Sequence, residues 1–146
     1  MAGLRFVTSK EMQVDHLPWG PHDWLCRPDI VDAEKLLLVR VHIPPGQAHQ
    51  FHRHPEQEEI IYVLEGSAEQ WVDRDKRVLA AGEVAHIPAN MVHGTYNIGT
   101  GPLRVLAILS PAKIQGPALV DVSQDEPWHS LRMEHSPQSH RAHREI

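Results

Sequence analysis

Cysteine and long apolar runs are scarce in this chain of 146 residues, and each scarcity excludes a class of protein. The single cysteine, Cys26, cannot form an internal disulfide framework, and its isolation fits a reducing compartment. No apolar run approaches the roughly 20 residues that span a bilayer, and the first residues lack the apolar stretch of a signal peptide. We therefore expect a soluble, cytoplasmic protein with no membrane contact.

Positive charge is also in the minority. The chain has 14 Lys and Arg against 19 Asp and Glu, a formal net charge of -5 at pH 7, and no basic cluster that would neutralise a row of phosphates. We therefore expect no nucleic-acid partner.

Histidine, by contrast, is abundant: the chain has 12 His against two Phe and two Tyr. Imidazole is the commonest metal ligand and the usual side chain for proton transfer near neutral pH. The positions of these histidines therefore decide the functional interpretation.

The length fits one compact domain, and the apolar pattern divides it into three parts. Residues 1–35 hold isolated apolar anchors among Pro and Gly without sustained spacing, which predicts an N-terminal arm packed on the main body. Residues 36–111 predict a barrel core, because short runs rich in Val, Ile and Leu alternate there with turn residues. Residues 112–146 form a C-terminal extension, with one short helix expected around Trp128 to Met133.

The pattern of residues 36–111 predicts an all-β core. Its expected strands are LLLVRVHI, EIIYVLEG, AEQWVD, RVLA, VAHIPA, HGTYNI and LRVLAILS. Turn signals every 8 to 12 residues or so are typical of a β-sandwich or barrel and leave no room for crossover helices. The sequence therefore predicts an antiparallel barrel with Arg74 and Asp75 near a hairpin tip.

Two segments of this core, each beginning at a glycine, combine histidine with other polar residues at regular spacing. Residues 46–66 read GQAHQFHRHPEQEEIIYVLEG, with the pattern carried by Gly46, His52, His54, Glu59 and Gly66. Residues 82–97 read GEVAHIPANMVHGTYN, with the pattern carried by Gly82, Pro88, His93 and Asn97. Together the two segments resemble the two motifs of the cupin family.

One position departs from that pattern, because Asn90 stands where the family usually has Gly. We expect a left-handed backbone conformation there, which Asn tolerates best after Gly. The resemblance implies a cupin (RmlC-like) antiparallel jelly-roll barrel, a homodimer, and one divalent metal ion held by His52, His54, Glu59 and His93.

Strand geometry leads to the same site, where the resemblance selects Glu59 among three nearby glutamates through its spacing to Gly66. His52 and His54 share a strand face, Glu59 follows a short turn, and His93 arrives from a distant strand. Three imidazoles and a carboxylate leave open positions on a divalent ion such as Fe, Mn, Ni, Zn or Co. A hydrogen-bonded core pair of histidines is the alternative, and two further carboxylates compete as ligands, Glu56 and Glu58.

Strand parity also suggests substrate contacts. Gln50 shares the parity of His52, and Thr95 and Asn97 share that of His93, although Asn97 is equally suited to a turn. The expected apolar cavity wall is Ile61, Val63 and Val72.

Side chains expected on the outer face or at a dimer surface are Tyr62 and Trp71. Histidines expected at the surface or satisfied in the core are His42, His49 and His86, and those expected in a solvated tail are His129, His135, His140 and His143.

The function expected from this site is that of a metal-dependent enzyme acting on a small organic metabolite, with an iron-dependent, dioxygenase-like oxygenase favoured. A lyase or isomerase, in which the metal polarises a carbonyl or carboxylate, is one alternative. A non-catalytic small-molecule binding protein is the other, because a fold alone does not choose a reaction.

Overall fold

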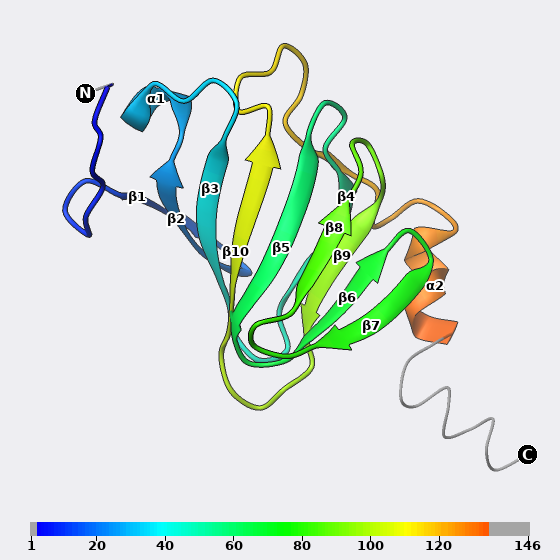
Figure 1. Cartoon of the computed structure of the whole chain (residues 1–146). Helices are drawn as coiled ribbons and strands as arrows, with labels where there is room; N and C mark the ends of the chain where they lie inside the picture. Colours follow the sequence, from blue (N-terminus) through cyan, green and yellow to red (C-terminus); the bar gives the residue numbers. More distant parts are fainter. Residues whose placement is uncertain (1–2, 135–146) are drawn as a thin grey trace, which may run out of the picture.

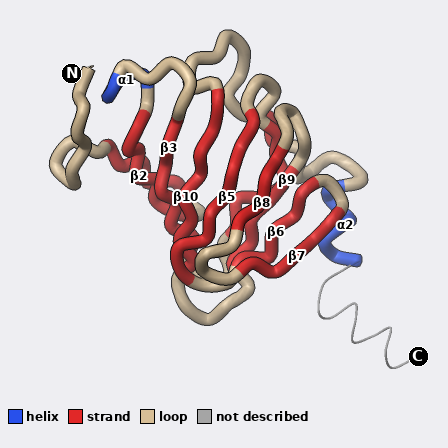
Figure 2. The backbone as a smooth tube through the Cα atoms, in the orientation of Figure 1, coloured by secondary structure: helices blue, strands red, loops and turns tan. Residues whose placement is uncertain are grey.

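The computed structural model describes residues 3–134, which form two antiparallel sheets facing each other, with few helices (Figures 1 and 2). The elements, in chain order, are β1 (Gln13–Leu17), β2 (Gly20–Cys26), α1 (Pro28–Val31), β3 (Leu37–Ile43), β4 (Ala48–Arg53), β5 (Glu58–Glu65), β6 (Ala68–Val72), β7 (Asp75–Leu79), β8 (Val84–Ile87), β9 (His93–Asn97), β10 (Leu103–Ser110), β11 (Val120–Asp121) and α2 (Trp128–Glu134). One sheet has the order β1-β2-β3-β10-β5-β8 and the other β11-β4-β9-β6-β7. The predicted all-β jelly-roll fold is confirmed.

The core lies between the two sheets. Along β3 every second side chain is buried, and β10 pairs with it in the same alternation, so both strands present a continuous apolar face to the interior. Residues of β5, β6 and β8 complete this cluster, among them Ile61, Val63, Ala68 and Ile87.

A second apolar cluster covers the outer face of the smaller sheet. Phe51 and Trp71 pack there against Leu131 of α2 and the half-buried Trp128, so the predicted outer-face position of Trp71 is confirmed. The predicted C-terminal helix is also present, as α2, and His129 is exposed on it. The tail histidines His135, His140 and His143 lie outside the described residues.

The N-terminal region contains two strands that the sequence pattern did not predict. β1 and β2 form a hairpin, and β2 pairs with β3, so residues 13–26 extend the larger sheet. All five residues of β1 are exposed, and without a buried face the strand leaves no period-two apolar signal. Its backbone hydrogen bonds to β2 hold it in place.

Special backbone conformations occur at the predicted turns. Asn90 has φ 68°, which confirms the left-handed conformation expected where the family usually has Gly. Asp73 and Arg74 form the tip between β6 and β7, next to Asp75, the first residue of β7. Gly66 has φ +89°, and a Cβ there would lie 2.4 Å from the Pro102 carbonyl oxygen, so this position requires glycine. No helix within residues 3–134 is long and apolar enough to cross a membrane.

Candidate metal centre

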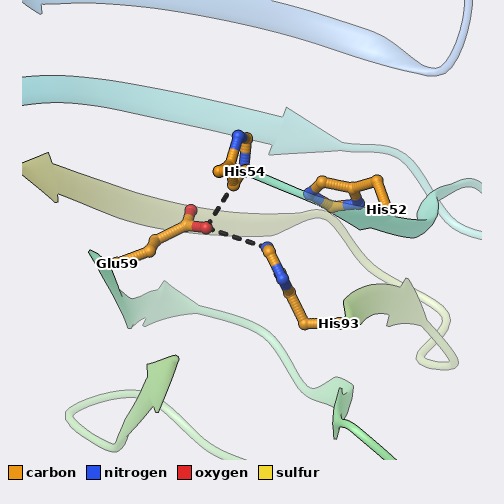
Figure 3. A group of neighbouring side chains, drawn as sticks. All are labelled: His52, His54, Glu59 and His93. Carbon is orange, nitrogen blue, oxygen red and sulfur yellow. Dashed lines mark ion pairs between the residues drawn. The ribbon is translucent and has the colours of Figure 1, made fainter. Parts of the chain in front are cut away.

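Four polar side chains from three neighbouring segments meet inside the barrel (Figure 3). His52 lies on β4 opposite His93 of β9, His54 follows the end of β4, and Glu59 lies on β5. One ligand atom from each of the four lies within 4.8 Å of the others. The chain thus brings together the four residues that the sequence singled out, in a group that could hold one metal ion.

Each of the three imidazoles is oriented by a backbone carbonyl at Nδ1. The acceptors are the Gln50 oxygen for His52 (2.6 Å), the Met91 oxygen for His93 (3.0 Å) and the Ala118 oxygen for His54 (2.7 Å). A carbonyl oxygen only accepts hydrogen bonds, so the Nδ1 atoms carry the protons and the three Nε2 atoms keep their lone pairs. This is the tautomer that a metal-binding histidine needs.

The carboxylate of Glu59 lies against two of these rings. Its Oε1 is 2.8 Å from His93 Nε2 and 3.3 Å from His54 Nε2 (Figure 3). Burial raises the pKa of Glu59, but the His54 and His93 rings, once protonated at Nε2, donate hydrogen bonds and positive charge to the carboxylate and hold its pKa well below its ordinary value. Glu59 is therefore an anion at neutral pH.

Two buried atoms of the cluster have no hydrogen-bond partner, Glu59 Oε1 and His93 Nε2. They lie 2.8 Å apart, but with the His93 proton on Nδ1 neither atom has a hydrogen to donate to the other. Burial also lowers the pKa of His52 well below its ordinary value, which keeps that ring neutral. Unpaired buried polar atoms are costly, and a divalent cation would satisfy both of these at once, so the residues present fit a metal ion.

The competing carboxylates have other partners. Glu56 accepts hydrogen bonds from the backbone amides of Gln115 (3.2 Å) and Gly116 (2.5 Å), and Glu58 pairs with the exposed His86 at 2.5 Å. Both are exposed, and neither belongs to the group formed by the four clustered residues. Of the three adjacent glutamates, only Glu59 points into the cluster.

A cavity of about 1000 Å³ opens beside the cluster, and His52, His54 and Glu59 form part of its wall. Its apolar lining comes mostly from the larger sheet and includes Trp19, Trp24, Leu37, Val39, Val41 and Leu109. A volume near 1,000 Å³ is at the upper end for small-molecule sites.

The residues predicted as substrate contacts lie mostly elsewhere. Ile61, Val63 and Val72 face inward as parity predicted, but they belong to the packed core and do not line this cavity. Thr95 is also absent from the lining, because its hydroxyl donates to Gln70 Oε1 at 2.6 Å. Gln50 lines the cavity but is exposed, not inward-facing. The lining of this cavity therefore includes Gln50 but otherwise comes from residues other than those expected.

Asn97 serves the turn rather than the cavity. Its side-chain amide donates to the carbonyls of Ile43 and Gly101, and its oxygen accepts from the Gly99 amide. Its Oδ1 and Nδ2 atoms are therefore occupied by the loop that follows β9.

The sequence reasoning missed an aromatic wall beside the metal cluster. The ring of His49 stacks on His52 with centroids 3.6 Å apart, and Trp19 stacks on the His49 ring at 4.4 Å. His22 packs edge-on against Trp19 and also lines the cavity. The pairing register of β4 shifts between His49 and His52, and this bulge places His49 beside His52, where unbroken alternation would place Gln50.

Comparison with known proteins identifies the family and the fold. The Cupin domain family model matches residues 39–109. The protein MJ1618 of Methanocaldococcus jannaschii is 33% identical over 87 residues, covering 60% of this chain and 70% of that protein. Polyketide synthase CurC of Streptomyces cyaneus is 31% identical over 123 residues, covering 84% of this chain and 79% of CurC. The structure of KdgF from Halomonas sp. superposes with a TM-score of 0.65 at 23% identity, covering 74% of this chain and 95% of KdgF, a likeness that shows the fold.

Proposed function

Because this chain belongs to the cupin family, we propose that it binds one divalent metal ion through His52, His54, Glu59 and His93 and acts as an oxygenase on a small organic metabolite. The observation that carries this proposal is the convergence of three preset Nε2 lone pairs and one unpaired carboxylate oxygen beside a cavity of about 1000 Å³.

The chain's own residues provide the ligands and the environment. The four protein ligands would leave open positions on a divalent ion, and Fe(II) held there would supply dioxygen activation and an anchor for the substrate. The apolar side chains of β3 and β10 in the cavity wall exclude bulk water, which strengthens electrostatic interactions at the site. If both atoms of dioxygen enter the product, the substrate itself supplies all four electrons.

The cavity favours a flat metabolite with more than one ring. Its volume exceeds what a two- or three-carbon acid would fill, and Trp19 and Trp24 line it with aromatic surface that suits a planar ligand. The relative from Streptomyces cyaneus is named a polyketide synthase, so polyketide-like compounds belong among the substrates to test.

The experiment loads the protein with Fe(II) without oxygen, offers a panel of phenolic and polyketide-like metabolites, and then admits oxygen. Oxygen uptake, together with a product that is heavier by two oxygen atoms, supports the proposal. The Glu59→Ala protein should lose this activity, and Glu58→Ala, which removes an exposed neighbouring carboxylate, should keep it. Absence of oxygen uptake with every metabolite would argue against an oxygenase.

A lyase or isomerase is a second candidate, and His22 is the observation that favours it. This buried ring lines the cavity, and its Nδ1 lies 3.3 Å from the Gly20 carbonyl, which leaves Nε2 as a proton acceptor. Burial lowers the pKa of His22, so the ring is a neutral base near pH 7. Turnover without oxygen that is lost in His22→Phe while metal binding remains would favour this reaction.

The non-catalytic alternative makes a different prediction from both. A binding protein would hold one metabolite reversibly, return it unchanged with any metal, and gain thermal stability from it. Mass spectrometry of the recovered ligand separates this outcome from turnover.

We also propose a homodimer, formed through the outer face of the larger sheet. There Ile60, Tyr62 and Val84 are exposed, at 39%, 37% and 53%, and Tyr62 lies opposite both Leu106 and Val84 in neighbouring strands. A second copy would cover this apolar surface by a two-fold, self-complementary contact. Because β1 and β2 pair within their own sheet, an N-terminal arm exchanged between subunits is a less suitable dimer interface than this face.

A further inference from the structure

Residues 111–119 form an irregular segment between β10 and β11 that lies over the metal cluster. Ala118 supplies the carbonyl that holds His54, and Ile114, Ala118 and Leu119 line the cavity. Most of the segment is exposed: Ala112 is buried and Ile114 is half-buried, whereas 113 and 115–119 are exposed. Apolar packing therefore contributes little to fixing the part of the segment that reaches His54.

Hydrogen bonds fix the segment instead, and two of their partners, Glu56 and Gln57, lie in the turn between His54 and Glu59. The Gln57 side-chain amide donates to the Pro111 carbonyl at 3.0 Å, and the Glu34 carbonyl accepts from the amides of Ala112 and Lys113. These contacts hold only the beginning of the segment.

Glu56 holds its middle. One carboxylate oxygen accepts from the Gln115 amide at 3.2 Å and the other from the Gly116 amide at 2.5 Å. Hydrogen bonds from two successive amides to a carboxylate are charge-assisted and stronger than neutral ones. A Cβ at Gly116 would lie 3.0 Å from this carboxylate, so glycine permits the close approach.

The contact matters most for His54, because the three histidines are oriented in different ways. The Nδ1 atoms of His52 and His93 bind carbonyls two residues earlier in the chain, so their tautomers are set locally. His54 depends on Ala118, which is 64 residues away and two residues beyond the amide that Glu56 holds. Its tautomer therefore depends on an exposed segment.

We infer that Glu56 is a positioning residue of the metal centre: by binding the 115–116 amides it keeps the Ala118 carbonyl on His54 Nδ1, and so keeps the His54 Nε2 lone pair directed at the metal. This inference rests on the proposed metal site. It assigns a role to a glutamate that the sequence offered only as a rival ligand.

The experiment compares Glu56→Ala and Glu56→Gln with Glu58→Ala, in the full chain. Glu58→Ala is the matched control, because it removes an equal charge from an exposed glutamate of the same loop region. The first readout is the imidazole ¹⁵N spectrum of metal-free protein at about pH 8.5, where neutral histidines dominate. The second is the dissociation constant for Co(II), with its visible absorption spectrum.

In wild type and Glu58→Ala we expect His54 to be the Nδ1–H tautomer. In Glu56→Ala we expect a mixture of tautomers and Co(II) binding weaker by about tenfold or more, the usual effect of losing a group that orients a ligand. Glu56→Gln retains one acceptor oxygen and should lie between them. The His52 and His93 signals should remain unchanged in all variants.

An unchanged His54 tautomer and unchanged Co(II) affinity in Glu56→Ala would overturn the inference. A tautomer change that occurs equally in Glu58→Ala would also overturn it, because charge alone would then explain the effect. If wild-type protein bound no metal, the proposed function would fail, but the tautomer comparison would still decide the role of Glu56.

Discussion

Replacing His93 by Ala should abolish the stabilisation that metal gives this protein. In the metal-free protein Glu59 Oε1 and His93 Nε2 are buried without hydrogen-bond partners, and a bound ion would satisfy both. An ion that binds only the folded chain at about 100 times its Kd stabilises it by about 2.7 kcal/mol. For a domain of this size that corresponds to a rise in Tm of about 5–11 °C.

Losing a group that only supports a ligand weakens metal binding by about 10- to 100-fold. Losing one of the four ligands themselves should therefore weaken it by at least about a hundredfold. At the same metal concentration the remaining stabilisation is then about 0.4 kcal/mol, a shift below roughly 2 °C. The His93→Ala chain should still fold without metal, because the apolar core between the sheets does not depend on the ion.

The assay is thermal unfolding, followed by circular dichroism with and without Co(II) or Mn(II). His86→Ala is the control, because it removes a histidine that is exposed and pairs with Glu58. We expect the full shift in wild type and His86→Ala and almost none in His93→Ala. A shift that persists in His93→Ala would refute the reasoning, because the ion would then bind elsewhere.

Three further predictions concern pH, the glycines and the dimer. The pKa of His54 is raised above its ordinary value of 6.5, because contacts with Glu59 outweigh burial, so protons compete with metal for this ring already near neutral pH. Co(II) affinity should therefore begin to fall near neutral pH and be lost by about pH 4. A Co(II) affinity that stays constant over that range would contradict imidazole ligation. In chemical denaturation, Gly66→Ala should lower the free energy of unfolding by more than about 2 kcal/mol, because its Cβ would clash with a carbonyl oxygen 2.4 Å away. Gly46→Ala, where φ is +79° but the surrounding space is open, should lower it by only about 1 kcal/mol. Equal losses for the two variants would contradict the packing argument. Wild type should scatter light as a dimer and the Tyr62→Glu/Val84→Glu protein as a monomer, and an intact chain that is monomeric would overturn the dimer proposal.

The barrel and the metal cluster could be predicted because both leave periodic signals in the sequence. β3, β5 and β10 alternate buried and more exposed side chains, and turn residues separate them. The four ligands follow fixed spacings, and the structure places them together. The choice of Glu59 over Glu56 and Glu58 came from family spacing, and the physical reason, that each rival has its own partners, is visible only in three dimensions.

The cavity could not be predicted from strand parity alone. Parity says which side chains face inward, but not that Val39 borders the cavity while Ile61 and Val63, in the same core cluster, do not. The bulge in β4 adds a residue to the alternation, so His49 takes the place expected for Gln50. The orientation of His54 depends on a backbone carbonyl, Ala118, and a backbone atom leaves no mark in the sequence.

The most direct test of the metal centre is anomalous X-ray scattering from crystals of the metal-loaded protein. The account predicts one strong peak about 2.0–2.2 Å from the Nε2 atoms of His52, His54 and His93 and from a carboxylate oxygen of Glu59. A peak held by other residues, or no peak among these four in protein that contains stoichiometric metal, would contradict it.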